Sequence, residues 1–332
     1  MDKILILPLL LGFFATLFSL PFWIKGAKRV GLIGEDIHKR DKKNAAEAGG
    51  IIVLLGFTLG TLSYIAIKTF VLETDITTIQ IFALLSTTLI AGIIGFVDDL
   101  LGWKIGLTKI PRIILLFFAA IPLMVINAGD STVLGVEFGL LYPLLLIPIG
   151  IIGATTTFNF LEGYNGLGTS QGILILSALA LTTYLNSMAW LSLICLIMVA
   201  CLIAFYIFNK YPASVFPGDV MTYSIGALIA VIAILGNIEK IAIFFFIPYI
   251  IETGLKIRGR LKKESFAKLN NKGGLEMPYE KFYGLEHIAI YLLKKLKKGK
   301  EVKENEVVWL INLFQILVIG VGFLLFSGGL GL

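Results

Sequence analysis

The sequence has 332 residues, of which 57% are hydrophobic and only 15% are charged, and its mean hydropathy is +0.91. This composition is far from that of a soluble domain. The net charge of +6 comes without a soluble basic domain, which argues against nucleic acid as a partner. Apolar runs near twenty residues recur along the whole length, and each is long enough to cross a bilayer as a helix.

We therefore predict an all-α integral membrane protein, a single polytopic domain over residues 1–332. The first apolar run, 4–24, is too long for the core of a signal peptide and is followed by no cleavage pattern, so it is predicted as the first helix. Cys195 and Cys201 lie six residues apart in one apolar run, which indicates buried packing with neither a disulfide nor a metal site. The pattern predicts about ten transmembrane helices, at 4–24, 49–70, 79–97, 110–127, 138–158, 171–187, 189–208, 221–236, 240–257 and 306–328.

Charge indicates the orientation of these helices. All Lys and Arg residues except Lys3, Lys68 and Lys240 fall on the side that carries the connections 25–48, 98–109, 159–170, 209–220 and 258–305. The positive-inside rule places these five segments in the cytoplasm and both termini outside. Their positive charge suits anionic lipid head groups and anionic substrates.

The first two cytoplasmic segments contain carboxylates at helix ends. Glu47 precedes two glycines at the start of the second helix, where the helix dipole favours a negative charge. Asp98 and Asp99 end the third helix, and Lys104 and Lys109 follow them. Acids at the edge of an apolar helix are candidates for function, although a solvated loop with simple lysine ion pairs is the plainer interpretation.

The third and fourth segments add amides and a further acid. Asn159 and Asn165 lie in a glycine-rich stretch after a hydrophobic helix; amide oxygens suit hard cations such as magnesium, whereas Asn165-Gly166 is also a common turn. Phe216-Pro-Gly-Asp219 places an acid on a tight turn beside an aromatic ring. Asp219 could be a helix N-cap, and Phe216 either an interfacial anchor or a stacking surface for a flat base.

The fifth segment, 258–305, is a long basic cytoplasmic loop. Arg258 and Arg260 are spaced to capture phosphates. The lysine-rich run 294–303 is typical of a surface that binds anionic lipids, and 288–296 is a candidate interfacial helix. The two histidines, His38 and His287, stand alone in the sequence, and no role is predicted for either.

Together these residues favour phosphoryl transfer at a membrane surface, because they combine oxygen ligands for magnesium, arginines for a pyrophosphate and carboxylates near an attacking group. Three stretches resemble the signature loops of the polyprenyl-phosphate N-acetylhexosamine-1-phosphate transferases: Phe96-Val-Asp-Asp99, 159–167 and Val215-Phe-Pro-Gly-Asp219. The ordered set is far more specific than any one motif.

Within that superfamily the chain is most similar to the archaeal and eukaryotic UDP-N-acetylglucosamine–dolichyl-phosphate N-acetylglucosaminephosphotransferases. The similarity rests on Asp36-Ile-His-Lys39 followed by Glu47-Ala-Gly-Gly50, on Arg258-Gly-Arg260 and on 275–282. It implies a magnesium-dependent glycosyl-1-phosphate transferase, with manganese as an alternative ion. The enzyme would transfer N-acetylglucosamine 1-phosphate from UDP-N-acetylglucosamine to polyprenyl or dolichyl phosphate and release UMP. That is the first committed step of lipid-linked glycan assembly, for protein glycosylation or a cell-surface glycan.

The resemblance also implies roles for individual residues. Asn159 and Asp219 would hold the magnesium ion, while Phe216 would stack on uracil and Asn165 would help to read it. Arg258 and Arg260 would grip the diphosphate, and Glu47 is a further candidate for substrate binding. Asp98 and Asp99 would position or deprotonate the lipid phosphate. Lys109 is the third catalytic candidate, because it matches the lysine that follows the aspartate pair, with one extra residue in the spacing. A covalent phospho-aspartate and a direct displacement need the same residues.

Several positions depart from the pattern of relatives. Glu162 and Asn165 stand where the enzymes of bacterial cell-wall lipid synthesis have aspartates, and their histidine-rich loop is absent, which argues against a muramoyl-pentapeptide substrate. Gly102 and Gly259 replace an asparagine and a histidine of the eukaryotic enzymes. The short outer loops and the composition rich in Ile and Lys are typical of a prokaryotic, in particular archaeal, plasma-membrane protein.

Two other classes remain as alternatives. A secondary transporter or lipid flippase would carry acids near the bilayer midplane and internal repeats, whereas here the acids lie at one rim and no repeat is visible. A CDP-alcohol phosphotransferase would need regularly spaced aspartates on facing helices. The sequence leaves open whether the protein forms a homodimer.

Overall fold

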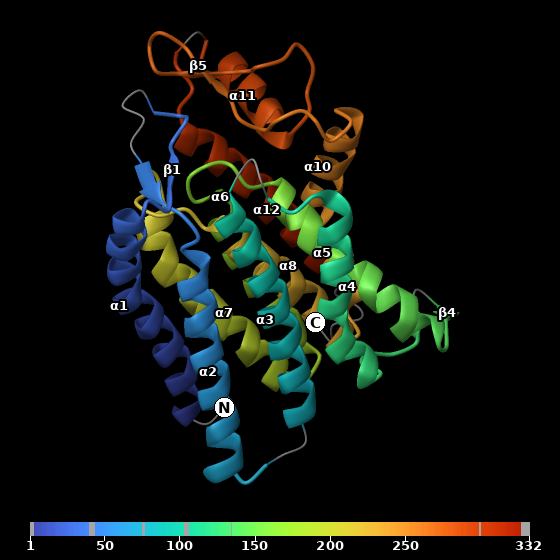
Figure 1. Cartoon of the computed structure of the whole chain (residues 1–332). Coiled ribbons are helices and arrows are strands. Elements are labelled where there is room, and N and C mark those ends of the chain that lie inside the picture. Colours follow the sequence, from blue (N-terminus) through green and yellow to red (C-terminus); the bar gives the residue numbers. More distant parts are fainter. Residues whose placement is uncertain are drawn as a thin grey trace.

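The protein is described here from a computed structural model, which covers residues 3–39, 44–74, 77–102, 106–133, 135–298 and 300–326. Parts of two predicted features, Trp103-Lys104 after the aspartate pair and the end of the last helix beyond 326, lie outside these ranges. Figure 1 shows a bundle of long helices with the short strands and α11 gathered mainly at one end.

The helices follow the apolar runs closely, because a backbone in lipid can satisfy its hydrogen bonds only within itself. The helices are α1 Leu7–Val30, α2 Gly50–Phe70, α3 Thr78–Leu101, α4 Lys109–Val125, α5 Ile147–Phe160, α6 Leu167–Leu185, α7 Ala189–Asn209, α8 Gly218–Leu235, α9 Glu239–Phe245, α10 Ile247–Arg258, α11 Leu285–Leu296 and α12 Glu304–Phe326. A 3₁₀ turn, Lys3–Ile6, leads into α1 and a π-helical turn, Tyr142–Leu146, leads into α5.

Three small antiparallel hairpins connect the helices. They pair β1 Ile33–Glu35 with β2 Asn44–Ala46, β3 Thr132–Val133 with β4 Val136–Glu137, and β5 Lys268–Leu269 with β6 Leu275–Glu276. The first hairpin is tied to the segment before α8 by a parallel bridge between Ala46 and Val215. The all-α prediction is therefore confirmed for the bundle, and the strands only shape its loops.

Eight helical segments in the described ranges are long and apolar enough to cross a membrane. The protein is thus an integral membrane protein, while the count of ten spans stays a prediction. The two segments that fall short are α4, with 17 residues, and the predicted span 240–257. The latter is divided at Phe246, because Pro248 has no N–H to continue the ladder and restricts the residue before it.

Helix α8 lies at the centre of the bundle, with α3 and α5 as its main neighbours and α2 and α6 beside them. Within its spanning window 83% of α8 is buried by protein, against 22% for α1. Close approach depends on glycine: a Cβ at Gly226 would lie 2.6 Å from Thr155 Cα, and one at Gly95 would lie 2.4 Å from Asp219 O. Both cysteines are buried and free, as predicted.

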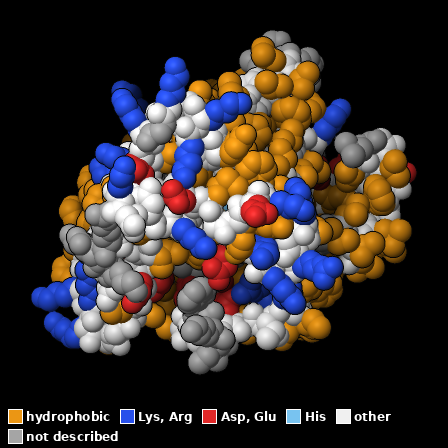
Figure 2. All heavy atoms as spheres, turned by 90° about the horizontal axis from the view of Figure 1, so that it is seen from above, with side chains coloured by type: hydrophobic (Ala, Val, Ile, Leu, Met, Phe, Trp, Pro, Cys, Tyr) orange, Lys and Arg blue, Asp and Glu red, His pale blue; other side chains and the backbone are white. Residues whose placement is uncertain are grey.

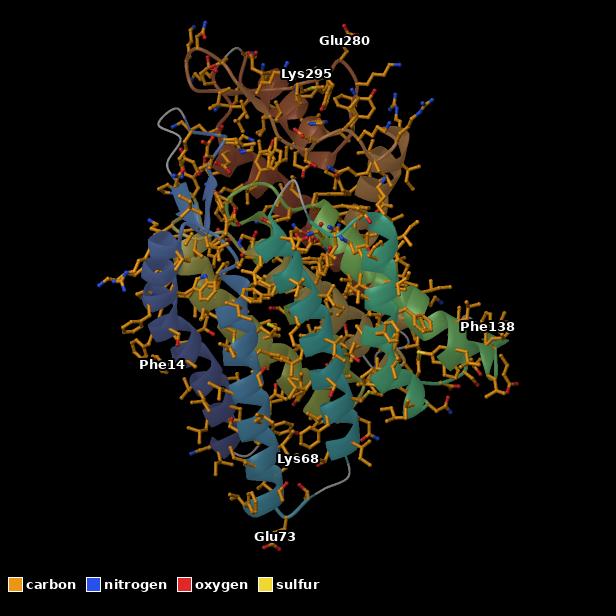
Figure 3. The ribbon with its side chains drawn as sticks, viewed as in Figure 1. Phe14, Lys68, Glu73, Phe138, Glu280 and Lys295 are labelled. Atoms are coloured by element: carbon orange, nitrogen blue, oxygen red, sulfur yellow. The ribbon has the colours of Figure 1, made fainter. Side chains whose placement is uncertain are left out.

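The two ends of the bundle differ in chemical character. Figure 3 places Glu280 and Lys295 at the end that carries α11, and Lys68 and Glu73 at the opposite end. All five segments predicted to share a face meet at the first end. Contacts between distant residues show this directly: Asp36 reaches Asn165, and Asn165 reaches Glu304 at the start of α12.

The contact between α5 and α8 gives a first prediction. Gly226→Ala should lower the free energy of unfolding by roughly 1–3 kcal/mol, because the added methyl group meets the backbone of α5, which cannot rotate away. Thermal unfolding of the detergent-solubilised protein measures the effect. Gly153→Ala on α5 is the matched control, because a Cβ there meets no atom within 4 Å. Equal stability of the two variants would contradict the close-packed interface.

Candidate active site

The aspartate pair binds two different partners. Asp99, near the end of α3, accepts hydrogen bonds from the backbone N–H groups of Asp219 (2.7 Å) and Val220 (3.1 Å). These two N–H groups are unpaired at the start of α8, so Asp99 acts as the cap of that helix. Gly218 permits the contact, because its φ is +70° and a Cβ would lie 2.3 Å from Asp99 Oδ2.

Asp98 is buried and is held by groups from the loop before α4, from α4 and from α8. Its Oδ1 accepts the Leu107 N–H, and its Oδ2 accepts a hydrogen bond from Arg112 Nη2, both at 2.5 Å. The Tyr223 hydroxyl on α8 lies 3.4 Å from Oδ2. One aspartate therefore fixes the start of α8 while its neighbour meets the cation of α4.

Asp219 lies within the first turn of α8, but its side chain does not cap its own helix. Its Oδ1 accepts a hydrogen bond from Asn159 Nδ2 (2.7 Å), and its Oδ2 lies 3.7 Å from Arg112 Nη2. Asn159 Nδ2 also lies 2.9 Å from Thr222 Oγ1. The interpretation of Asp219 as a plain N-cap is wrong, because Asp99 has that role.

The charges of this cluster do not balance. Among the described residues, three carboxylates, Asp98, Asp99 and Asp219, meet one guanidinium, that of Arg112, whose central carbon lies 5.6 Å from the Tyr223 ring. Like charges at such short range repel strongly in a partly buried site. A cation or a proton bound here would relieve the repulsion.

A magnesium ion fits the donor set of Asp219 and Asn159, since carboxylate and amide oxygens are the ligands of hard cations. In the described ranges no three His, Cys, Asp or Glu side chains are grouped to hold an ion, so the site would depend on few protein ligands and on substrate phosphates. The Asn159 amide donates through its nitrogen to Asp219, because a carboxylate without a bound cation accepts hydrogen bonds. Rotation of the amide about its terminal torsion would present oxygen.

Glu47 and Phe216 form the side of the site that faces the first hairpin. A Cβ at Gly34 would lie 1.9 Å from Glu47 Oε1 and 3.1 Å from Phe216 Cδ2, so both side chains rest on the first hairpin. Phe216 N–H donates to Ala46 O (2.7 Å), which holds the ring in register. Burial raises the pKa of the Glu47 carboxyl, although the Ala48 N–H opposes the shift.

Glu162 follows α5 and lies against the start of α6, where Gly168 leaves room for its carboxylate. The pKa of Glu162 is raised to about 8, and burial is the largest cause. The N–H groups of Gly163 and Gly168 act in the opposite direction. Its Oε2 is buried without a partner. The sequence analysis noted Glu162 only as a difference from relatives and predicted no role for it. The structure places it in a buried position beside the site.

Asn165 is buried at the turn before α6, with an exposed fraction of 6%. Its amide donates to Asp36 Oδ2 (2.9 Å), and its backbone N–H donates to Glu304 Oε1 (2.7 Å). Gly166 follows with φ of +80°, so the turn that Asn-Gly predicts is present as well. The two interpretations of this dipeptide are compatible.

Three predicted basic residues are not paired with the acidic cluster among the described residues. Lys109 is exposed at the first position of α4, and Arg258 and Arg260 are exposed at the end of α10. None of the three side chains makes a hydrogen bond or ion pair within the described part of the chain. Their assignments to catalysis and to diphosphate binding remain predictions.

Figure 2, which looks down on this end, shows acidic side chains near the middle of the face with Lys and Arg around them. Sequence reasoning missed the central cation, Arg112, and its neighbour Tyr223. One feature of the sequence could have indicated Arg112. It is the only charged residue after Lys109 in the apolar run of α4, and it lies one helical turn from that lysine. Tyr223 had none, since it lies inside an apolar helix.

Comparison with known proteins agrees with this geometry. The family model of glycosyl transferase family 4 matches residues 81–237, the range that contains Asp98, Asp99, Asn159 and Asp219. A protein of Saccharolobus solfataricus named as a UDP-N-acetylglucosamine–dolichyl-phosphate N-acetylglucosaminephosphotransferase is 36% identical over 92% of each chain. A protein of the same name from Sulfolobus acidocaldarius is 33% identical over 95% of each chain.

A more distant relative is the phospho-N-acetylmuramoyl-pentapeptide-transferase of Halalkalibacterium halodurans, which is 27% identical over 76% of this chain and 81% of its own. The apolar bundle, with its cluster of acids at one end, is that of a membrane-embedded sugar-phosphate transferase. The chain belongs to glycosyl transferase family 4. The resemblance recognised from the sequence is thereby confirmed.

The arrangement around Arg112 gives a second prediction. Arg112→Gln should destabilise the protein by roughly 1–3 kcal/mol in EDTA, because Asp98 and Asp219 lose their shared cation. Added magnesium should recover part of that loss. Thermal unfolding with and without the ion is the measurement. Lys109→Gln, one turn earlier on α4 and exposed, is the control that should unfold like the parent protein. If the two variants behave alike, Arg112 does not compensate the acids.

Proposed function

We propose that the protein transfers N-acetylglucosamine 1-phosphate from UDP-N-acetylglucosamine to a polyprenyl phosphate of the dolichyl type. An oxygen of the lipid phosphate attacks the phosphorus bonded to the sugar, and the bond from that phosphorus to the oxygen of UMP breaks. The products are polyprenyl-diphosphate N-acetylglucosamine and UMP. The names of the two archaeal relatives, at 33–36% identity over most of the chain, support this substrate pair.

The single observation that carries the proposal is the cluster of Asp98, Asp99 and Asp219 at one rim of an apolar bundle, with one guanidinium among them. A transporter would need such acids along a path through the membrane. Acids confined to one rim suit chemistry between a water-soluble nucleotide and a lipid head group. Membership in a transferase family also argues against the transporter alternative.

We further propose that magnesium is held by Asp219 and Asn159, with manganese as a substitute. When bound, the ion would offset the charge of the diphosphate and help UMP to leave. Arg112 keeps the Asp98 carboxylate paired and turned toward Asp219. Asp98 would then lie beside the entering lipid phosphate, and Asp99, committed to the α8 backbone, would position Asp219.

The nucleotide would occupy the side of the site bounded by the first hairpin. Phe216 presents a half-buried aromatic ring over Gly34, and Asn165 lies behind the same hairpin. Glu47 lines this side, and Arg258 and Arg260 would reach the diphosphate from the end of α10. The basic loops support a cytoplasmic location for this face under the positive-inside rule, with both termini outside.

A radiolabel transfer assay tests the function. Purified protein receives UDP-N-acetylglucosamine labelled in the sugar and its phosphate, a polyprenyl phosphate, and either magnesium or EDTA. The proposal expects label in the lipid phase and release of UMP, with magnesium only. Absence of transfer across a range of lipids and UDP-sugars would overturn it.

Asp219→Ala should reduce turnover by roughly 10²-fold or more, because it removes a metal ligand while Asp99 still caps α8 through the backbone. Initial rates over a magnesium titration measure this. The control is Asp130→Ala, an exposed acid at the opposite end whose carboxylate bonds only to Thr132 N–H in the described ranges. A stably expressed Asp219→Ala variant with normal activity at limiting magnesium would exclude the metal-ligand role.

Arg258→Ala and Arg260→Ala should each raise the KM for UDP-N-acetylglucosamine by about tenfold, since a charge-assisted phosphate contact is worth roughly 1.5–3 kcal/mol. The KM for the lipid phosphate should stay the same. Steady-state kinetics with each substrate varied in turn separates the two. Lys262→Ala, exposed two residues further on, is the control. An equal loss for both substrates would count against diphosphate binding.

A further inference from the structure

The strongest arrangement outside the acidic cluster is a buried polar network around Asn165. It joins four segments far apart in the sequence: the first hairpin, the turn before α6, the loop after α10, and the start of α12. Its central side chains are buried, with exposed fractions of 4% for Asp36, 6% for His38 and 4% for Glu304. Buried polar groups are costly unless they are paired, so each contact here restricts the others.

The two carboxylates decide which way the Asn165 amide faces. Asn165 Nδ2 lies 2.9 Å from Asp36 Oδ2 and 3.5 Å from Glu304 Oε2. A carboxylate accepts hydrogen bonds and donates none. The NH₂ end of the amide must therefore face Asp36 and Glu304, and the carbonyl oxygen must face away from them.

Other contacts hold these carboxylates in place. Lys39 Nζ lies 2.5 Å from Asp36 Oδ2, and His38 Nδ1 lies 3.5 Å from Glu304 Oε1. His38 Nε2 accepts the Ala267 N–H at 3.2 Å, so the proton of the neutral imidazole is on Nδ1 and points to Glu304. The His38 ring also packs on Tyr164, with centroids 4.5 Å apart.

The Asn165 oxygen is available to a ligand. No donor within the described ranges bonds to it, and it is not among the fully buried polar atoms without a partner. Its hydrogen-bonding capacity is therefore not used by any group in these ranges. Phe216 and Asn165 contact the same hairpin, because the Phe216 ring rests on Gly34 and Asn165 bonds to Asp36, two residues further along. Gly34 and Asp36 are about 7 Å apart along the extended chain, and a pyrimidine stacked over the first with one hydrogen bond toward the second would span that separation.

We propose that Asp36, Glu304 and His38 are positioning residues that make Asn165 a fixed hydrogen-bond acceptor and thereby select uracil over cytosine. The proposal rests on the proposed function for the assignment of a pyrimidine nucleotide to this side of the site. Uracil carries an N–H donor at the ring nitrogen between its two carbonyl carbons. Cytosine carries a bare nitrogen acceptor at the same position. A fixed carbonyl accepts a hydrogen bond from the first and repels the second.

The consequence for specificity is large, because a site built to hydrogen-bond one group leaves its own polar atom unpaired when the ligand lacks that group. An Asn free to rotate would discriminate poorly, since its NH₂ end suits cytosine as well as its oxygen suits uracil. The two carboxylates remove that freedom without touching the base.

The test compares UMP and CMP binding by calorimetry, without any transfer reaction. The parent protein should bind UMP about tenfold or more tightly than CMP. The double variant Asp36→Asn, Glu304→Gln replaces both carboxylates by amides, which can pair with either end of Asn165. It should bind CMP several-fold more tightly than the parent and lose most of the preference for UMP. General damage to the pocket would weaken both ligands together.

Glu306→Gln is the matched control, because Glu306 lies two residues from Glu304 but pairs with Lys297; it should keep the parent preference. If the double variant does not fold, Asp36→Asn alone removes the closer carboxylate and should shift the ratio in the same direction. A parent protein without preference, or a variant with the parent ratio, overturns the inference. UMP-selective binding without sugar-phosphate transfer would instead overturn the proposed function and leave the inference standing.

Discussion

The structure depends first on the carboxylate of Asp99, which binds the free backbone N–H groups at the start of α8. This contact fixes the ends of α3 and α8 against each other, and only glycine at position 218 leaves room for it. Once the two ends are joined, the neighbouring Asp98 must point toward Asp219 and Arg112. The acidic cluster is therefore a consequence of one helix cap. The two adjacent acids have different roles, since Asp99 caps α8 and Asp98 binds Arg112.

Electrostatics then divides the face into two regions. Around Arg112 the carboxylates outnumber the cations within the described ranges, so this region suits a metal ion and the phosphates that accompany it. Around Asn165, Lys39 pairs with Asp36 and the neutral His38 ring lies against Glu304. The two carboxylates hold the Asn165 amide by its NH₂ end, and what remains for a ligand is a neutral carbonyl. Carboxylates thus supply negative charge around Arg112, whereas around Asn165 they fix the direction of a hydrogen bond.

Much of the fold could be predicted from the sequence, because apolar length and terminal charges are local signals. The span 110–127 agrees with α4 to within two residues, whereas the ninth predicted span is divided before Pro248. The acids and amides of the site were also found, since polar residues at helix ends are conspicuous in an apolar chain. Arg112, Tyr223 and Glu304 were missed as site residues, because their importance comes only from which helices lie side by side.

The burial of α8 has a consequence for how the protein responds to its lipid surroundings. The depth of a helix that faces lipid adjusts to bilayer thickness by tilting or sliding. Helix α8 is enclosed by protein over most of its length, and glycine contacts at both Gly95 and Gly226 hold it in register with α3 and α5. A thicker or thinner bilayer would thus act first on the peripheral α1, while Asp219 keeps its height relative to Asp98 and Asn159.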